Sequence, residues 1–176
     1  QSDPETAKDI GNCYLQIKDI ANARKWYQAS LLINDQYAPS INNIASLESQ
    51  SGNHKIAIEL YQKAFAADPN LFQALLGAAS SYMALAQTDQ AIEFALNAIE
   101  ISPNTLQAHE LLGTIYQNSG QQVKAIEHYK IEISRNEKAV TSLTNLGIIL
   151  LQRKEAAESI KVLKKAAELS PNQQLS

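Results

Sequence analysis

The side chains that most often carry chemistry are few and scattered in this chain. It has three histidines, His54, His109 and His128, and one cysteine, Cys13. The histidines occupy unrelated positions of the repeating pattern described below, so we do not expect them to converge on one metal ion. The sequence has no phosphate-binding glycine loop, nucleophile elbow or paired-histidine motif. It therefore predicts a non-catalytic protein with no metal ion and no cofactor.

The composition excludes several classes of partner. A net charge of -3 and a pI near 5.6 argue against binding to nucleic acid or to an anionic lipid surface. The longest apolar run, 146–151, is too short to span a bilayer, so we expect no membrane insertion. A single cysteine excludes an internal disulfide framework. It is compatible with a reducing compartment, and we expect a cytoplasmic location.

A pattern with a period of 34 residues organises the chain. Five repeats follow one another without insertion, at 4–37, 38–71, 72–105, 106–139 and 140–173, and numbering each from 1 to 34 gives every residue a place. Place 8 is small in every repeat: Gly11, Ala45, Ala79, Gly113 and Gly147. Place 20 is also small, with Ala23, Ala57, Ala91, Ala125 and Ser159, whereas place 24 holds Tyr27, Tyr61, Ala95, Tyr129 and Leu163. Place 32 is proline in three repeats, at Pro69, Pro103 and Pro171.

These columns predict two helices in each repeat. Apolar residues recur at spacings of three and four on either side of a turn near place 15, where Gly52 and Gly120 suit a left-handed backbone. Small residues at places 8 and 20 let the two helices approach, and the ring at place 24 fills the space beside them. Gly77 lies inside a predicted helix and has no such explanation. The predicted helices are 4–17, 20–34, 38–51, 54–67, 72–85, 88–101, 106–119, 122–135, 140–153 and 156–169.

The columns resemble tetratricopeptide repeats over nearly the whole chain. The fourth repeat is the clearest copy, with Leu112, Gly113, Tyr116, Ala125 and Tyr129 at the places the family favours. The resemblance implies an all-α fold: a single array that forms a right-handed alpha-alpha superhelix of five antiparallel helix pairs. It also implies that the first helix of each pair lines a concave groove.

The ends of the chain bear on its context. Arrays of this kind need a polar capping helix, and the chain stops at Ser176, where the next helix would begin. We expect the chain to be a segment of a longer protein. Alternatively, a second copy covers the terminal helices and forms a homo-oligomer.

Residues at places 2, 5, 6, 9, 12 and 13 share one face of each first helix, and the resemblance assigns them to the groove. Most are uncharged amides and hydroxyls, which can both donate and accept hydrogen bonds and so suit the backbone of an extended peptide. The alternative is that they are simply solvated polar residues. The candidate groove residues are Lys8, Asn12, Gln16, Asn42, Asn43, Ser46, Gln50, Gln73, Leu76, Ser80, Met83, Gln107, Glu110, Thr114, Gln117, Thr141 and Asn145.

Some members of the family clamp the C-terminal carboxylates of chaperones with five residues. Lys8, Asn12 and Asn43 stand at three of the five places, but Gln73 and Gly77 replace the two remaining cations. Without these charges we predict no strong binding of acidic C-terminal tails. Arrays attached to sugar-transferring enzymes carry a ladder of asparagines at place 6, which only Asn43 and Asn145 fill here.

Two hypotheses of function follow from the sequence. The first is a protein–protein interaction scaffold that binds a peptide or protein segment in its groove. The second is the substrate-recruiting or dimerisation region of a larger enzyme, such as a transferase.

Overall fold

The computed structural model describes residues 3–170, which form helices joined by short turns and contain no strand. The ten helices of this range are α1 (Pro4–Gln16), α2 (Ile20–Ile33), α3 (Ala38–Gln50), α4 (His54–Ala67), α5 (Phe72–Ala84), α6 (Thr88–Ile101), α7 (Leu106–Asn118), α8 (Gln122–Arg135), α9 (Val140–Gln152) and α10 (Ala156–Leu169). None of them is long and apolar enough to cross a bilayer.

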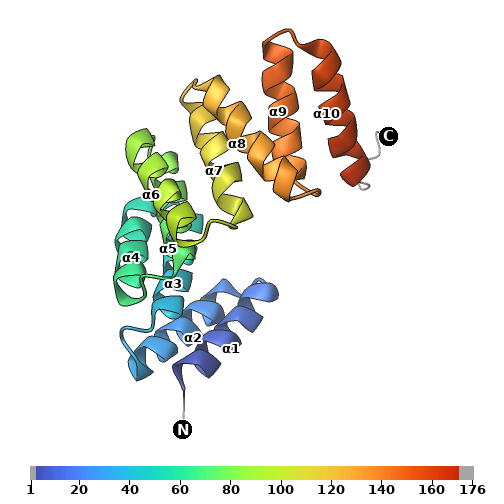
Figure 1. Ribbon diagram of the computed structural model, residues 1–176. Coiled ribbons are helices and arrows are strands. Elements are labelled where there is room, and N and C mark those ends of the chain that lie inside the picture. The colour runs from blue at the N-terminus through green and yellow to red at the C-terminus, as the bar shows by residue number, and fades with distance from the viewer. Residues whose placement is uncertain (1–2, 171–176) are drawn as a thin grey trace. The chain divides into compact units, whose positions relative to one another are not determined.

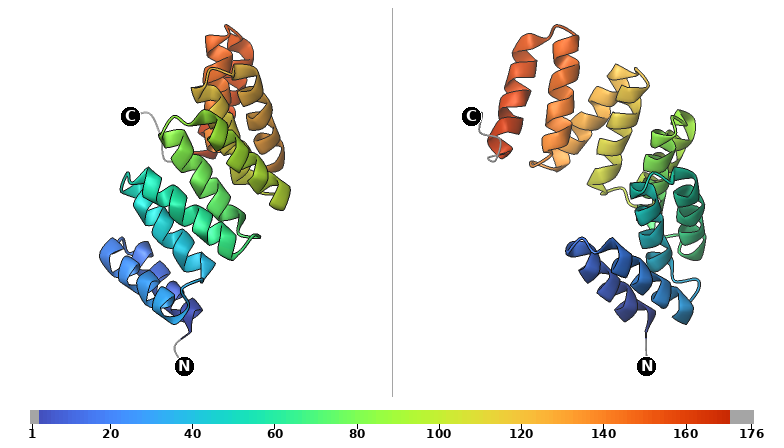
Figure 2. Two further views of the ribbon diagram at one scale, coloured as in Figure 1. Left: turned by 90° about the vertical axis from the view of Figure 1, so that its left-hand side faces the viewer. Right: turned by 180° about the vertical axis from the view of Figure 1, so that it is seen from behind.

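The helices form five pairs, one for each 34-residue repeat, so the predicted all-α architecture of paired helices is confirmed. Consecutive helices of a pair lie side by side (Figures 1 and 2). In each pair, the second helix begins at the predicted residue, and the first helix ends one residue earlier than predicted. Pro69 and Pro103 follow the ends of α4 and α6 as expected, whereas Pro171 lies outside the described residues.

The chain divides into two compact units, Gln1–Ser102 and Pro103–Ser176, which we call the N-terminal and C-terminal units. The N-terminal unit contains α1 to α6, and its core is built around small residues such as Ala45, Ala57 and Ala64 with the Tyr61 ring among them. The C-terminal unit contains α7 to α10 and buries Leu112, Ile115 and Ile149, each with at most 1% of its surface exposed. Each unit therefore has an apolar interior of its own.

The turn inside each pair places one residue in the left-handed region. Gly52 and Gly120 have φ of 81° and 76°, as their sequence position predicts. Lys18, Ala86 and Lys154 occupy the same place 15 in the other repeats and also have positive φ. The turn is thus a property of the repeat, and three repeats form it without glycine.

The side chain at place 24 packs directly against the residue at place 8 of its own repeat. A Cβ atom on Gly113 would lie 2.5 Å from the Tyr129 ring, and one on Gly11 would lie 2.5 Å from the Tyr27 ring. Gly147 faces Leu163 at the same distance. Glycine at these positions therefore lets the second helix bring a large side chain against the backbone of the first.

Gly77, which the repeat pattern leaves unexplained, has a packing role in the structure. A Cβ atom at this position would lie 2.2 Å from Cζ of Tyr61 and 2.3 Å from its Cε1. Tyr61 belongs to the preceding repeat, whose place 8 is occupied by Ala45. Its ring packs against α5, where only glycine leaves room for it.

A buried carboxylate lies on α8. Glu132 is 2% exposed and occupies a place that holds alanine in three other repeats. One of its oxygens accepts a hydrogen bond from Asn136, but Oε2 is buried without a partner among the described residues. Burial raises the pKa of Glu132 above its usual value of 4.5. Ionised Glu132 therefore destabilises the folded C-terminal unit.

Substituting Gly77 by alanine should destabilise the protein. Alanine normally stabilises a helix interior by about 0.5–1 kcal/mol relative to glycine. Here the clash with the Tyr61 ring should reverse the sign and cost about 1–3 kcal/mol of the free energy of unfolding, as measured by chemical denaturation. The cost should shrink in a Tyr61→Ala background, which gives the small side chain that Ala95 provides in the third repeat. A higher denaturation midpoint for Gly77→Ala would contradict this account.

Substituting Glu132 by glutamine should stabilise the protein at neutral pH. It removes a buried, partly unpaired charge while keeping the shape of the side chain, so we expect a gain of about 1–3 kcal/mol. Because the folded-state pKa is raised, the cost of ionisation is present above that pKa and disappears as the carboxyl group takes up a proton. The gain measured by thermal melting should therefore fall as the pH approaches 4.5. Glu127→Gln, at an exposed position of the same helix, is the control and should leave the melting temperature unchanged.

Candidate functional site

The candidate groove residues of the N-terminal unit lie on α1, α3 and α5. Gln16, Gln50, Gln73 and Ser80 are exposed, whereas Leu76 is only 8% exposed and offers a ligand little surface. The remaining candidates of this unit are half-buried: Lys8, Asn12, Asn42, Asn43, Ser46 and Met83. The face is therefore mostly polar, with exposed glutamines and half-buried asparagines.

A hydrogen-bonded cluster joins α1, α2 and α3 on this face. The Tyr27 hydroxyl donates to Oδ1 of Asn12 at 2.9 Å, and Nδ2 of Asn43 donates to the same oxygen at 3.1 Å. Asn12 in turn donates to Asp9, which forms an ion pair with Lys8 at 2.7 Å. Burial raises the pKa of Tyr27, so its hydroxyl keeps the proton that it donates. The cluster holds two amide side chains in fixed positions.

The same arrangement recurs in the C-terminal unit. The Tyr129 hydroxyl donates to Oε1 of Gln117 at 2.8 Å and lies 3.3 Å from the Thr114 hydroxyl. Nδ2 of Asn145, on the next first helix, donates to the Tyr129 hydroxyl at 3.2 Å. Burial raises the pKa of Tyr129 and also that of neighbouring Glu110. In both units, therefore, the hydroxyl of the tyrosine at place 24 lies within hydrogen-bonding distance of the side chain at place 9 of its own repeat. The asparagine at place 6 of the next repeat lies close to this pair.

The other candidates of the C-terminal unit surround this cluster. Gln107 and Thr141 are exposed, and Glu110, Thr114, Gln117 and Asn145 are half-buried. All of them belong to α7 or α9. The sequence placed these residues on one face of the first helices, but the hydrogen bonds to tyrosine were not predicted, because place 24 was assigned to packing alone.

The three residues that match the carboxylate clamp already bind other side chains of this chain. Lys8 is bound to Asp9, and that hydrogen bond raises the pKa of the lysine. Asn12 and Asn43 are bound to each other. The other two clamp places are Gln73 and Gly77, of which Gly77 packs against the Tyr61 ring. Weak binding of acidic C-terminal tails remains our prediction for this face.

Two of the three histidines meet, a contact that their repeat positions did not suggest. Nδ1 of His109 lies 3.1 Å from Nδ1 of His128, so one ring donates and the other accepts. The rings come together because places 4 and 23 face each other within one helix pair. Burial lowers the pKa of both histidines. No group of three or more potential metal ligands exists within residues 3–170, so the pair has no third ligand there.

Two other residues are more exposed than the sequence suggested. Cys13 stands at place 10, where Leu47, Ile115 and Ile149 of other repeats predict a packed side chain, but it is exposed. Trp26 stands at place 23, where Leu60 and Phe94 of later repeats predict packing. It is 36% exposed and lines a surface hollow with Leu32 and Ile33. Both residues lie on the first helix pair, before which no helix is present in residues 3–170. The prediction failed because it assumed the neighbour that later repeats have.

Comparison with known proteins agrees with the repeat pattern. Three family models described as tetratricopeptide repeat match residues 9–37, 49–115 and 107–173. The BBSome complex member BBS4 of Bos taurus is 28% identical over 134 residues, which cover 76% of this chain and 26% of BBS4. The human protein O-mannosyl-transferase TMTC1 is 25% identical over 169 residues, which cover 94% of this chain and 19% of that protein. The chain thus spans about a quarter or less of the length of the curated relatives it matches.

A solved structure shows the same fold. In the crystal structure of the APC/C hetero-tetramer Cut9–Hcn1, the matched chain has a TM-score of 0.84 at 22% identity, with 97% of this chain and 34% of that chain covered. The family matches cover most of the chain, and the structure has one helix pair for each 34-residue repeat. This chain therefore belongs to the tetratricopeptide repeat family.

Proposed function

We propose that this chain is a non-catalytic scaffold that binds a peptide or protein segment on the faces that the first helices form within each of its two units. The observation that carries the proposal is the repeated tyrosine-centred cluster, Asn12–Tyr27–Asn43 in one unit and Thr114–Tyr129–Asn145 in the other. Two copies of one polar arrangement fix asparagine side chains at equivalent places of α3 and α9.

The chemistry of these amides suits a peptide backbone. An asparagine side chain offers two N–H donors and a carbonyl oxygen. Asn43 and Asn145 each use one donor in the clusters, which leaves the carbonyl oxygen and the second N–H for a ligand. Because the clusters already restrict both side chains, binding costs less conformational entropy than it would for free amides.

The family and its relatives support an interaction role. Tetratricopeptide repeat arrays are protein-interaction domains, and the matched protein BBS4 is a member of a complex, the BBSome. The absence of catalytic sequence motifs favours a role in binding, and we propose that the array itself performs no reaction.

A second candidate rests on the match to TMTC1. That protein is an O-mannosyl-transferase, and the matched segment is 19% of its length. In this alternative the array belongs to a larger enzyme, where it recruits substrate or forms a dimer. The two candidates share the binding face and differ in what the rest of the protein does.

Substituting Asn43 or Asn145 by alanine should weaken peptide binding. Binders would be selected from a displayed library of random peptides, and their affinity for each variant measured by fluorescence anisotropy. Loss of hydrogen bonds from one amide should weaken binding roughly tenfold. Asn97→Ala changes an exposed asparagine on α6, a second helix, and should leave the affinity unchanged.

The role of the tyrosine can be tested separately. Tyr129→Phe leaves Asn145 in place but removes the hydroxyl to which it donates, so a smaller loss of affinity is expected for peptides that bind the C-terminal unit. Equal affinity of Asn43→Ala, Asn145→Ala and the unmodified protein for all selected peptides would show that the binding face lies elsewhere.

A further inference from the structure

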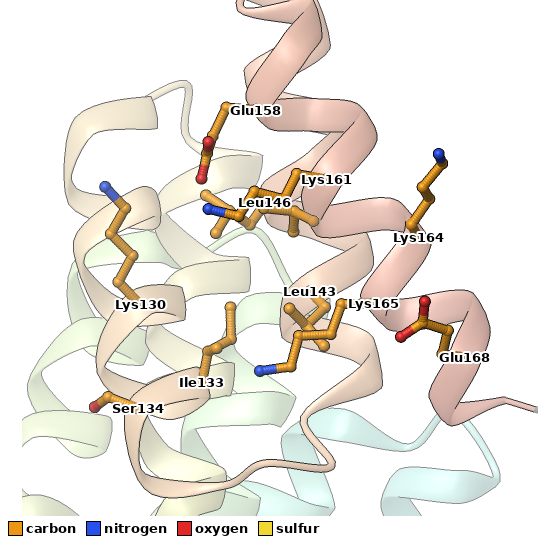
Figure 3. A pocket seen from close by; sticks show the side chains of 11 residues that line it. Lys130, Ile133, Ser134, Leu143, Leu146, Glu158, Lys161, Lys164, Lys165 and Glu168 are labelled. Carbon is orange, nitrogen blue, oxygen red and sulfur yellow. The ribbon is translucent and has the colours of Figure 1, made fainter.

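The C-terminal unit contains a groove on its second helices that the proposed binding face does not use. A cavity of about 680 Å³ lies between α8 and α10 (Figure 3). Leu143 and Leu146 of α9 form its floor, and Ile133 and Val162 contribute to its two walls. The volume is within the range of roughly 300–1,000 Å³ that is typical of ligand pockets. We call it the α8–α10 groove.

Two residues of the groove walls are smaller than their counterparts between α4 and α6. Ile133 and Val162 stand at places 28 and 23 of consecutive repeats. The equivalent pair between α4 and α6 is Phe65 and Phe94, and both rings pack against the core of the N-terminal unit. Two aromatic rings are therefore replaced by two shorter aliphatic side chains at the α8–α10 junction. The repeat architecture does not require this gap.

Lysines surround the opening. Lys130 projects from α8, while Lys161 and Lys165 reach from α10 across the groove toward α8 (Figure 3). The ion pairs found within residues 3–170 involve Lys8, Arg24 and Arg153, and none involves these three lysines. Glu158 lies at one end of the groove and Glu168 toward the other, while Lys164 points away from it (Figure 3). The groove is therefore locally basic in a chain whose net charge is -3.

We propose that the α8–α10 groove docks an acidic amphipathic segment of a partner protein. One or two large apolar side chains of the segment would fill the space that phenylalanines fill between α4 and α6. Its carboxylates would pair with Lys130, Lys161 and Lys165, whose aliphatic stems already line the apolar cavity. This surface is distinct from the first-helix face and does not depend on the function proposed for that face.

The shape of the site favours a protein segment over other polyanions. A nucleic-acid backbone has no apolar side chain to place between two helices, and the acidic chain would repel it. A bilayer surface cannot enter a cavity bounded by helices on both sides. An amphipathic segment uses both the apolar floor and the basic rim.

The test uses a synthetic peptide with leucines at helical spacing and glutamates between them, together with a matched peptide in which lysine replaces every glutamate. The full chain should bind the acidic peptide in an anisotropy titration, and binding should weaken as salt is added. The lysine peptide should not bind. Methyl NMR signals of Ile133, Leu143 and Val162 should shift with the acidic peptide, which locates it in the groove.

Two variants and one matched control make the test specific. Lys161→Glu with Lys165→Glu should weaken the acidic peptide by about tenfold or more. Val162→Phe, which restores the aromatic side chain found at Phe94, should weaken it without reversing any charge. The control is the double variant Lys25→Glu with Lys63→Glu. These two lysines are exposed, belong to the N-terminal unit and occupy the same repeat places as Lys161 and Lys165. Reversing their charge should leave the affinity for the acidic peptide unchanged.

Several results would overturn the proposal. These are failure of the acidic peptide to bind, equal weakening by the control pair, or methyl shifts confined to the α7 and α9 face. It would also be overturned if vesicles of phosphatidylserine and phosphatidylcholine, or duplex DNA, bound with the same dependence on Lys161 and Lys165 while the peptide did not. None of these results bears on Asn43 or Asn145, so the first-helix proposal would stand or fall separately.

Discussion

The packing of the place-24 side chain against the backbone of the first helix is the interaction on which the first, fourth and fifth helix pairs depend. Tyr27, Tyr129 and Leu163 each lie where a Cβ atom on the facing glycine would be only 2.5 Å away. Because the glycine has no Cβ atom, the large side chain rests on the backbone of the first helix, and this contact sets how closely the two helices of a pair approach. It also buries Tyr27 and Tyr129 completely, so the rings contribute both apolar burial and a fixed position for their hydroxyl groups.

The buried tyrosines link the stability of the repeat to the chemistry of its surface. Because the ring is held against glycine, its hydroxyl reaches the first-helix face at a fixed point, where it binds Asn12 in one unit and lies near Asn145 in the other. Tyr61 shows the limit of this arrangement. Its own place 8 is alanine, and its ring packs against Gly77, which stands at place 6 of the next repeat, where Asn43 follows Tyr27 and Asn145 follows Tyr129. Place 6 therefore either leaves room for the tyrosine ring, as Gly77 does, or supplies the asparagine of the hydrogen-bonded cluster, as Asn43 and Asn145 do.

The sequence predicted the backbone features that recur in each repeat, but not side-chain contacts within a repeat such as the meeting of His109 and His128. Helix ends, the left-handed turns at Gly52 and Gly120, and the small residue opposite each ring follow from spacing and from the size of single side chains. Features that depend on two repeats were missed. Gly77 is explained only by a ring from the preceding repeat, and the exposure of Cys13 reflects the lack of a preceding helix in residues 3–170. The α8–α10 groove likewise appears only when Ile133 and Val162 are compared with their counterparts at another junction.

Helix α9 connects the two candidate surfaces of the C-terminal unit. Thr141 and Asn145 lie on its first-helix face, whereas Leu143 and Leu146 form the floor of the α8–α10 groove. The two surfaces differ in their physical basis, since one offers uncharged amides and the other an apolar cavity with a basic rim. Screening by salt weakens interactions with exposed charges far more than hydrogen bonds between neutral groups. Ligands of the two surfaces should therefore respond differently to ionic strength, although one rigid helix supports both.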